Sequence, residues 1–169
     1  MDTGYGAITA LREGITALAL SYVAGILPNT TVWAAGIKPL RPKAWSGRGR
    51  PPKLMRRSAQ HRPIQVKELA LSLPATAWRT IKWREGSADW LSSRFARVRV
   101  RPAHRDYNLT AVRPEEWLLI EWPKGEDEPI KYWLSTLEGR GWRGFHHHAT
   151  LCIAAYGFLI CERETIPPS

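Results

Sequence analysis

Cysteine, acidic residues and long apolar runs are all scarce in this chain. Its two cysteines, Cys152 and Cys161, are too few for a disulfide framework, so a reduced cytoplasmic setting is expected. The longest apolar run, ATLCIAAYGFLIC at residues 149–161, is shorter than the roughly 20 residues that a membrane-spanning helix needs. The first residues, MDTGYGAITALREG, have neither a basic start nor a continuous apolar segment, and no secretion signal is expected.

The scarcity of acids leaves the chain strongly basic. Lys and Arg number 25 against 15 for Asp and Glu, which gives a net charge of +10 and a pI near 10.1. This balance favours a polyanionic partner such as nucleic acid, or else an anionic membrane, and the alternative is a basic protein without such a partner. With 169 residues, 44% of them hydrophobic, and nine tryptophans, the chain can form one folded domain with many loops.

Three segments have helical patterns, and a fourth is interpreted as a strand followed by a short helix. Residues 6–20 place Ile8, Leu11, Ile15 and Leu18 three or four residues apart, which is the stripe of an amphipathic helix. Helices are also predicted at residues 74–86 (PATAWRTIKWREG) and from about residue 144 to 164, and residues 64–73 (IQVKELALSL) read as a strand running into a short helix.

Strand patterns are clearest in the second half of the chain. Residues 93–104 (SRFARVRVRPAH), 116–123 (EWLLIEWP) and 130–136 (IKYWLST) are expected to form an antiparallel meander. Residues 21–27 (SYVAGIL) suit a buried strand in an α/β setting. Residues 30–63 contain many Pro, Gly, Lys and Arg and have no period, and they are expected to be one long exposed segment.

Two basic patterns are candidate DNA contacts. In SGRGRPPK, residues 46–53, the Arg-Gly-Arg-Pro core resembles an AT-hook, which lies in an A·T-rich minor groove; nonspecific phosphate contact is the alternative. Arginines also alternate with valines along residues 97–101, where they can follow a phosphate backbone or pair with Glu121, Asp127 or similar acids on neighbouring strands. The candidate DNA-contacting residues are Arg48, Arg50, Lys53, Arg56, Arg57, Arg97, Arg99 and Arg101.

Few residues suggest a metal site. His146, His147 and His148 are consecutive, so on a helix their side chains point about 100° apart and do not converge on one ion. Asp2 precedes a Gly-Tyr-Gly turn and a helix, which suits either a metal ligand at a strand end or a helix N-cap.

Several segments together resemble a known family, the bacterial insertion-sequence transposases of the DDE superfamily. The similarity covers nearly the whole chain and is carried by the segments MDTGYGAITALREGITALALSYVAGILPNTTVW, SGRGRPPK, IKWREG, LSSRFARVRVRPAHRDY, PEEWLLIEWP, KYWLSTL and EGRGWRGFHHHATLCIAAYGFLICERETIPPS. The resemblance implies an RNase H-like core interrupted by a β-rich insertion. It also implies an Asp, Asp, Glu triad that holds two Mg²⁺ ions for attack on phosphodiesters.

The resemblance identifies only one acid of that triad here. The family pattern D-x-G-Y-G places the second catalytic aspartate at Asp2, and the first would lie upstream of Met1, so its strand is expected to be missing. The third acid belongs to a pattern of Tyr, two residues, Arg, three residues, Glu, six residues, Lys, which does not occur in this chain. Residues 137–138 therefore look like a deletion junction, and Glu138 matches a block beyond the catalytic helix.

These inferences predict an α/β fold consisting of an incomplete RNase H-like transposase core, a β-rich antiparallel insertion and a C-terminal helix. The expected parts are residues 1–29 from the core, 30–137 from the insertion and 138–169 from the C-terminal helical segment. The first strands of an RNase H-like sheet would lie upstream of Met1, so the strand at residues 21–27 is expected to lose its sheet partners. The meander is expected to be the best-ordered region, with the two end helices packing on it.

The predicted function is that of a truncated, internally deleted DDE transposase that is catalytically inactive and binds no Mg²⁺ productively. A small DNA-binding module that competes at transposon ends, and a pseudogene product without a selected role, are the alternatives. DNA is the expected partner, self-association is left open, no membrane contact is expected, and the expected location is the bacterial cytoplasm, at the nucleoid.

Overall fold

A computed structural model of the chain describes residues 3–84 and 90–137. Residues Met1–Thr136 make up one compact unit, and the fold is that of its described part. Asp2, the three consecutive histidines, both cysteines and the predicted helix at residues 144–164 lie outside the described residues.

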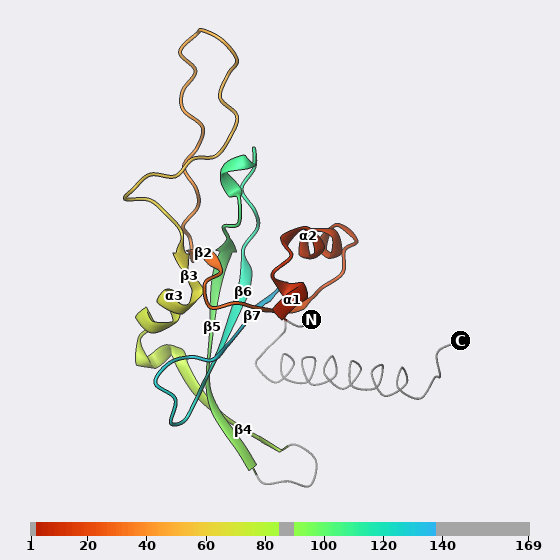
Figure 1. Cartoon of the computed structure of the whole chain (residues 1–169), viewed down its shortest axis with the longest axis vertical. Helices are drawn as coiled ribbons and strands as arrows, with labels where there is room; N and C mark the ends of the chain where they lie inside the picture. The colour runs from red at the N-terminus through yellow and green to blue at the C-terminus, as the bar shows by residue number, and fades with distance from the viewer. Residues whose placement is uncertain (1–2, 85–89, 138–169) are drawn as a thin grey trace, which may run out of the picture. The chain divides into compact units, whose positions relative to one another are not determined.

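The described residues form a seven-stranded sheet whose paired strands are all antiparallel (Figure 1). Its order is β1-β7-β6-β5-β2-β3, and β4 pairs with β5 beside this path. The strands are β1 (Val23–Ile26), β2 (Thr31–Ala34), β3 (Ile64–Gln65), β4 (Trp78–Arg84), β5 (Trp90–Pro102), β6 (Glu116–Pro123) and β7 (Lys131–Ser135). The helical segments are α1 (Thr3–Gly6), α2 (Thr9–Ala17), α3 (Val66–Ser72), and the 3₁₀ turns η1 (Ala75–Ala77) and η2 (Asp106–Asn108).

The predicted antiparallel meander is confirmed. Strand β5 pairs with β6 from Ser93 to Val100, and β6 pairs with β7 from Trp117 to Glu121. Gly125, with φ of +92°, allows the turn between β6 and β7 to adopt a left-handed conformation that other residues rarely adopt. Local pairing of consecutive strands therefore builds the centre of the sheet.

The hydrophobic core lies on one face of this sheet. Alternate residues of the strands point to that face, because successive side chains of a strand lie on opposite sides. Strands β1, β2, β5, β6 and β7 contribute to it together with Tyr22 and with α3, whose Val66, Leu69 and Ala70 are buried. The strand members of the core cluster are Ala24, Ile26, Val32, Ala96, Val100, Leu118, Ile120, Tyr132 and Leu134.

The strand at residues 21–27 has a sheet partner, so the expectation that it would lose its neighbours is wrong. It forms β1, which pairs with β7 from Val23↔Ser135 to Ile26↔Tyr132. The meander supplies the missing neighbour because β7 would otherwise leave its own outer edge unpaired. The described part is accordingly strand-rich with short helices, while the RNase H-like arrangement and the three-part division of the chain stay predictions.

The predicted helix at residues 74–86 is wrong over most of its length. After the 3₁₀ turn η1, Trp78–Arg84 forms β4, which pairs with β5 along seven residues, from Trp78↔Ala96 to Arg84↔Trp90. The aromatic and β-branched residues Trp78, Thr80 and Ile81 favour a strand. Tertiary pairing with the long strand β5 therefore overrides the helical pattern.

The predicted helix at residues 6–20 is confirmed as α2, but its apolar stripe is not buried as a whole. Of its members, Ile15 packs against the core, whereas Ile8 and Leu18 are 49% and 72% exposed. The buried side instead contains Thr9 and Arg12. No described helix is long and apolar enough to cross a membrane.

The prediction that residues 30–63 form one long exposed segment is wrong for the first residues of the segment. Its first residues form β2, where Val32 and Trp33 are fully buried between β3 and β5. The prediction of a strand running into a short helix at residues 64–73 is confirmed by β3 and α3. Only the intervening residues 35–63 form a long loop.

Candidate nucleic-acid interface

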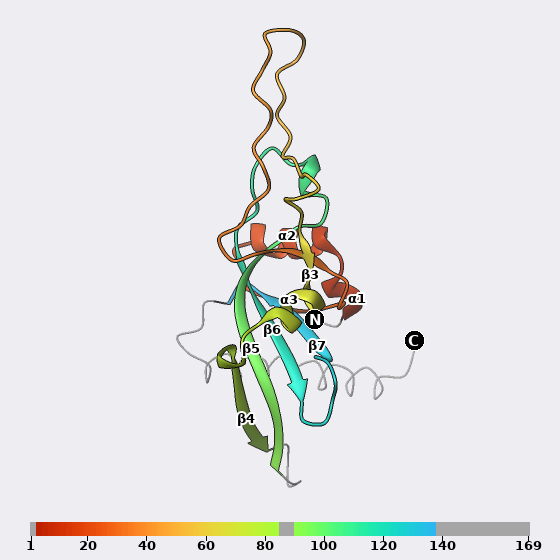
Figure 2. The ribbon, with the colours of Figure 1, turned by 90° about the vertical axis from the view of Figure 1, so that its left-hand side faces the viewer.

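Residues 35–63, here called the basic loop, join β2 to β3 and stand off the end of the sheet (Figures 1 and 2). The loop has no Asp or Glu. Its basic residues are Lys38, Arg41, Lys43, Arg48, Arg50, Lys53, Arg56, Arg57 and Arg62. With nine basic and no acidic residues, this segment has a net charge of +9 and attracts anions.

The two branches of the basic loop are held together at one bridge. The backbone amides of Leu40 and Arg56 each donate to the other residue's carbonyl, both at 2.9 Å, and Nε of Arg56 donates to the Arg41 carbonyl at 3.0 Å. Beyond this bridge the chain turns at Gly47 and Gly49, with φ of +83° and +72°. The loop is thus a two-branched projection with a turned tip.

The turned tip bears on the AT-hook hypothesis. An AT-hook presents an extended Arg-Gly-Arg-Pro backbone to the minor groove. Here Gly49, between Arg48 and Arg50, has a left-handed backbone, and both arginines are exposed. The loop therefore does not have the extended backbone of an AT-hook, and Arg48 and Arg50 are each exposed to solvent.

One aromatic side chain lies at the tip. Trp45 is 55% exposed, and its indole Nε1 donates to the Gly49 carbonyl at 3.2 Å. This hydrogen bond fixes the ring beside the turn that carries Arg48 and Arg50.

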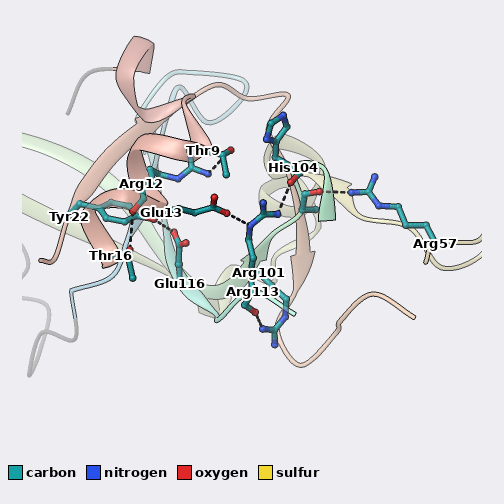
Figure 3. Close-up of polar contacts among 11 residues, drawn as sticks. Thr9, Arg12, Glu13, Thr16, Tyr22, Arg57, Arg101, His104, Arg113 and Glu116 are labelled. Carbon is teal, nitrogen blue, oxygen red and sulfur yellow. Dashed lines mark hydrogen bonds and ion pairs between the residues drawn. The ribbon is translucent and has the colours of Figure 1, made fainter. Parts of the chain in front are cut away.

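The base of the basic loop is anchored by three residues, here called the loop clamp: Trp33, Arg57 and Asp106. The Asp106 carboxylate, 4% exposed, accepts hydrogen bonds from Trp33 Nε1 at 2.6 Å and from Arg57 Nε at 2.8 Å. Trp33 precedes the loop and Arg57 lies in its returning branch, so one buried carboxylate ties both branches to η2 (Figure 3 labels Arg57).

Further contacts support the clamp. Arg57 also donates to the Ala103 carbonyl, and the Met55 amide donates to the Leu109 carbonyl at 3.0 Å. His61 donates from Nε2 to the Lys38 carbonyl at 2.8 Å, and its ring lies 4.9 Å from that of Trp33. The base of the loop is consequently fixed, and Arg57 is committed to this structural role.

The arginine strand, Arg97, Arg99 and Arg101 on β5, is largely occupied by neighbouring side chains. Arg97 and Arg99 stack on the Trp117 ring, with guanidinium carbons 4.1 and 4.7 Å from its centroid. Arg101 donates to Glu115 at 3.3 Å and to the Arg113 carbonyl, and Arg99 lies 4.0 Å from Glu115.

The acid that pairs with this strand is therefore Glu115, whereas Glu121 pairs with Lys131 at 3.4 Å. Of the three arginines only Arg97 is classed as exposed. The strand's arginines are a weaker candidate for DNA contact than those of the loop tip.

A buried polar cluster lies under α2 (Figure 3). Tyr22 donates from its hydroxyl to Glu116 Oε2 at 2.6 Å, and Arg12 donates to the Gly6 carbonyl and to Thr9. Burial raises the pKa of Glu116 above its ordinary value, although the hydrogen bond from Tyr22 and the charge of Arg12 act in the opposite direction.

Burial and the nearby Glu116 charge likewise raise the pKa of Tyr22. Sequence patterns did not point to this cluster, because Arg12 lies on the polar side of the predicted helix and Tyr22 and Glu116 are 94 residues apart. At its outer side Arg113 pairs with Glu13 at 2.7 Å and donates to the His104 carbonyl at 2.6 Å.

The acids among the described residues do not fit a two-Mg²⁺ site. Such a site needs several carboxylates that converge on ions about 3.5–4 Å apart. Asp106, Glu13 and Glu116 are instead engaged by Arg57, Arg113 and Tyr22. Within residues 3–84 and 90–137 no group of three or more His, Cys, Asp or Glu could hold a metal ion, and Asp2 lies outside this part.

Comparison with known proteins gives one match. The family model described as DDE superfamily endonuclease matches residues 1–89, a little over half of the chain, including the whole basic loop. No curated protein and no solved structure matches the chain.

Proposed function

The chain belongs to the DDE superfamily of endonucleases, and on this premise we propose that it binds DNA through the tip of the basic loop. The observation that carries the proposal is the acid-free loop of nine Lys and Arg residues, anchored at its base and projecting from the sheet. DDE endonucleases act on DNA, and a projecting cationic segment can reach phosphates that the flat face of a sheet cannot.

The tip residues Arg48, Arg50 and Lys53 are the main contacts in this proposal. All three are exposed, and no ion pair within the described residues involves them. An arginine without an acidic partner keeps its charge available for a phosphate, and each phosphate neutralised releases condensed counterions. The contact is electrostatic and weakly specific for sequence.

The test is the affinity of the full chain for a labelled duplex across a salt series. Log affinity should fall with log salt by about 0.9 per phosphate contacted. The double variant Arg48→Ala/Arg50→Ala should reduce that slope by about 2. The charge-matched control Lys82→Ala/Lys124→Ala, on exposed residues outside the loop, should leave it near the wild-type value, and equal losses from both variants would refute the loop as the DNA contact.

We propose further that the chain derives from a bacterial insertion-sequence transposase with an RNase H-like core, and that by itself it does not cut DNA. DDE endonucleases generally depend on a divalent metal held by three acids. The third-acid motif of the transposases that this chain resembles does not occur in it. Asp2, the match to the second acid, would then be vestigial, and the protein would reside at the nucleoid in the cytoplasm.

This second proposal predicts no Mg²⁺-dependent cleavage or strand transfer of a labelled transposon end by the purified chain. Cleavage that Asp2→Ala abolishes would refute it. A preference for transposon ends over scrambled duplex, without cleavage, would support the alternative of a small DNA-binding module that competes at those ends.

A further inference from the structure

We propose that Trp45 forms a stacking site for an unpaired DNA base, so that the basic loop prefers DNA with unpaired nucleotides over fully paired duplex. The inference rests on the proposed DNA-binding function and names the form of DNA that the loop recognises.

The position of the ring carries the inference. Trp45 is more than half exposed at the tip of a loop that has no acidic residue. A ring exposed to this extent can stack on a flat partner, because stacking removes its apolar face from water. Other tryptophans of the chain are covered by the fold: Trp33 is 2% exposed, and Trp78 packs against the core.

The ring is also oriented before any ligand arrives. Its only hydrogen-bond donor is satisfied by the Gly49 carbonyl at 3.2 Å. The indole therefore needs no further polar partner, and a base that stacks on it loses no hydrogen bond. Because this bond runs to the turn between Arg48 and Arg50, the same turn can hold the phosphates on either side of the stacked base.

This combination of cations and one aromatic ring suits an unpaired nucleotide. Proteins that bind single strands combine a positive path along the backbone with aromatic rings on which bases stack, and stacking accepts every base. In a paired duplex the base faces are covered by their neighbours, so Trp45 gains nothing there. The arginines alone would bind both forms, and Trp45 would discriminate between them.

The experiment compares two labelled duplexes of equal length and charge, one fully paired and one with a short internal mismatch bubble. Affinities of the full chain are measured by fluorescence anisotropy at one fixed salt concentration. The wild type should bind the bubble about tenfold more tightly, which corresponds to one stacked base. Trp45→Ala should lose this preference while its affinity for the paired duplex stays unchanged.

Two variants control the result. Trp45→Phe keeps an aromatic face and should retain most of the preference, whereas Leu54→Ala removes an exposed apolar side chain of the same loop and should change nothing. A 2-aminopurine placed in the bubble should be quenched by the wild type and not by Trp45→Ala, and unchanged thermal transitions would show that the variants fold.

The outcomes separate this inference from the function on which it rests. Equal binding of both duplexes by the wild type, or an equal loss on both in Trp45→Ala, overturns the stacking site and leaves the loop as a phosphate contact. Binding of neither duplex overturns both the site and the proposed function.

Discussion

The basic loop and the arginine strand have the same residue types but opposite surroundings. Arg48 and Arg50 lie on a segment without acids and are exposed, whereas Arg99 and Arg101 of β5 are held by Trp117 and Glu115. A guanidinium paired with a carboxylate has already used hydrogen bonds that a phosphate would accept, and one stacked on a ring is held against the fold. The density of arginine in a sequence therefore identifies a DNA contact only where the arginines are not already paired or stacked within the fold.

The largest expected effect concerns the loop clamp, which anchors the base of the basic loop. Asp106→Ala should leave Arg57 and Trp33 without their shared buried acceptor and destabilise the fold by about 3 kcal/mol. Urea unfolding measures this loss. Trypsin should also cut the basic loop faster in the variant, because both branches are released.

A conservative replacement sharpens this prediction. Asp106→Asn keeps an acceptor for Trp33 and removes the charge that pairs with Arg57, so its loss of stability should be smaller than that of Asp106→Ala. If both variants matched the wild type in stability and in loop proteolysis, the buried carboxylate would not anchor the loop.

The next effect compares the two regions directly. Arg101→Ala should lower the free energy of unfolding by about 1–2 kcal/mol, because its hydrogen bonds to Glu115 and to the Arg113 carbonyl are lost. Its DNA salt slope should stay unchanged. Arg48→Ala should do the reverse, with stability unchanged and the slope reduced by about 0.9. A reduced slope in Arg101→Ala would mean that the arginine strand also contacts DNA, and the two regions would then not differ in this respect.

A smaller effect is expected from the ring under the arginine strand. Trp117→Leu keeps an apolar residue and removes the face on which Arg97 and Arg99 stack. Loss of two partly exposed cation–π contacts should cost about 1 kcal/mol. Thermal unfolding at matched salt measures it, with Trp45→Leu on the loop as a control that should leave stability unchanged.

The smallest effect depends on pH. Burial raises the pKa of Glu116 in the folded chain, so the folded state keeps its proton to a higher pH than the unfolded state does. Stability should therefore decline as pH rises from the ordinary carboxyl pKa through the raised value. Glu116→Gln should flatten this decline, while the exposed Glu126→Gln should not. A pH profile of stability that Glu116→Gln leaves unchanged would contradict the assignment.

The sequence predicted the regions whose partners are close in the chain. The alternation of β5 and the two following strands fixed the meander, since each of these strands pairs with the next. The pairing of β1 was missed because its partner β7 lies more than 100 residues away. β4 is an exception, because its partner β5 follows directly but the residues of β4 have a helical pattern that the pairing overrides.

The sequence predicted which segments of the candidate site are basic, but not which of their arginines are free to contact DNA. Charge alone located the basic loop and the arginine strand. Which arginines are available depends on contacts such as Arg57 with Asp106, 49 residues apart, and Arg113 with Glu13, 100 residues apart. No periodicity or spacing reports such distant pairs, so Arg57 and Arg101 were grouped with Arg48 and Arg50 although their environments differ.

The loop clamp also bears on where this chain could be divided. Trp33 and Arg57 lie within residues 1–89, which match the endonuclease family, whereas Asp106 and all of β5 lie beyond them. A recombinant piece ending at residue 89 would lose the carboxylate that anchors the loop and the strand that pairs with both β2 and β4. The end of the family match at residue 89 therefore does not separate two independently folding parts, and a chimaera that carries the basic loop would also need the segment around Asp106.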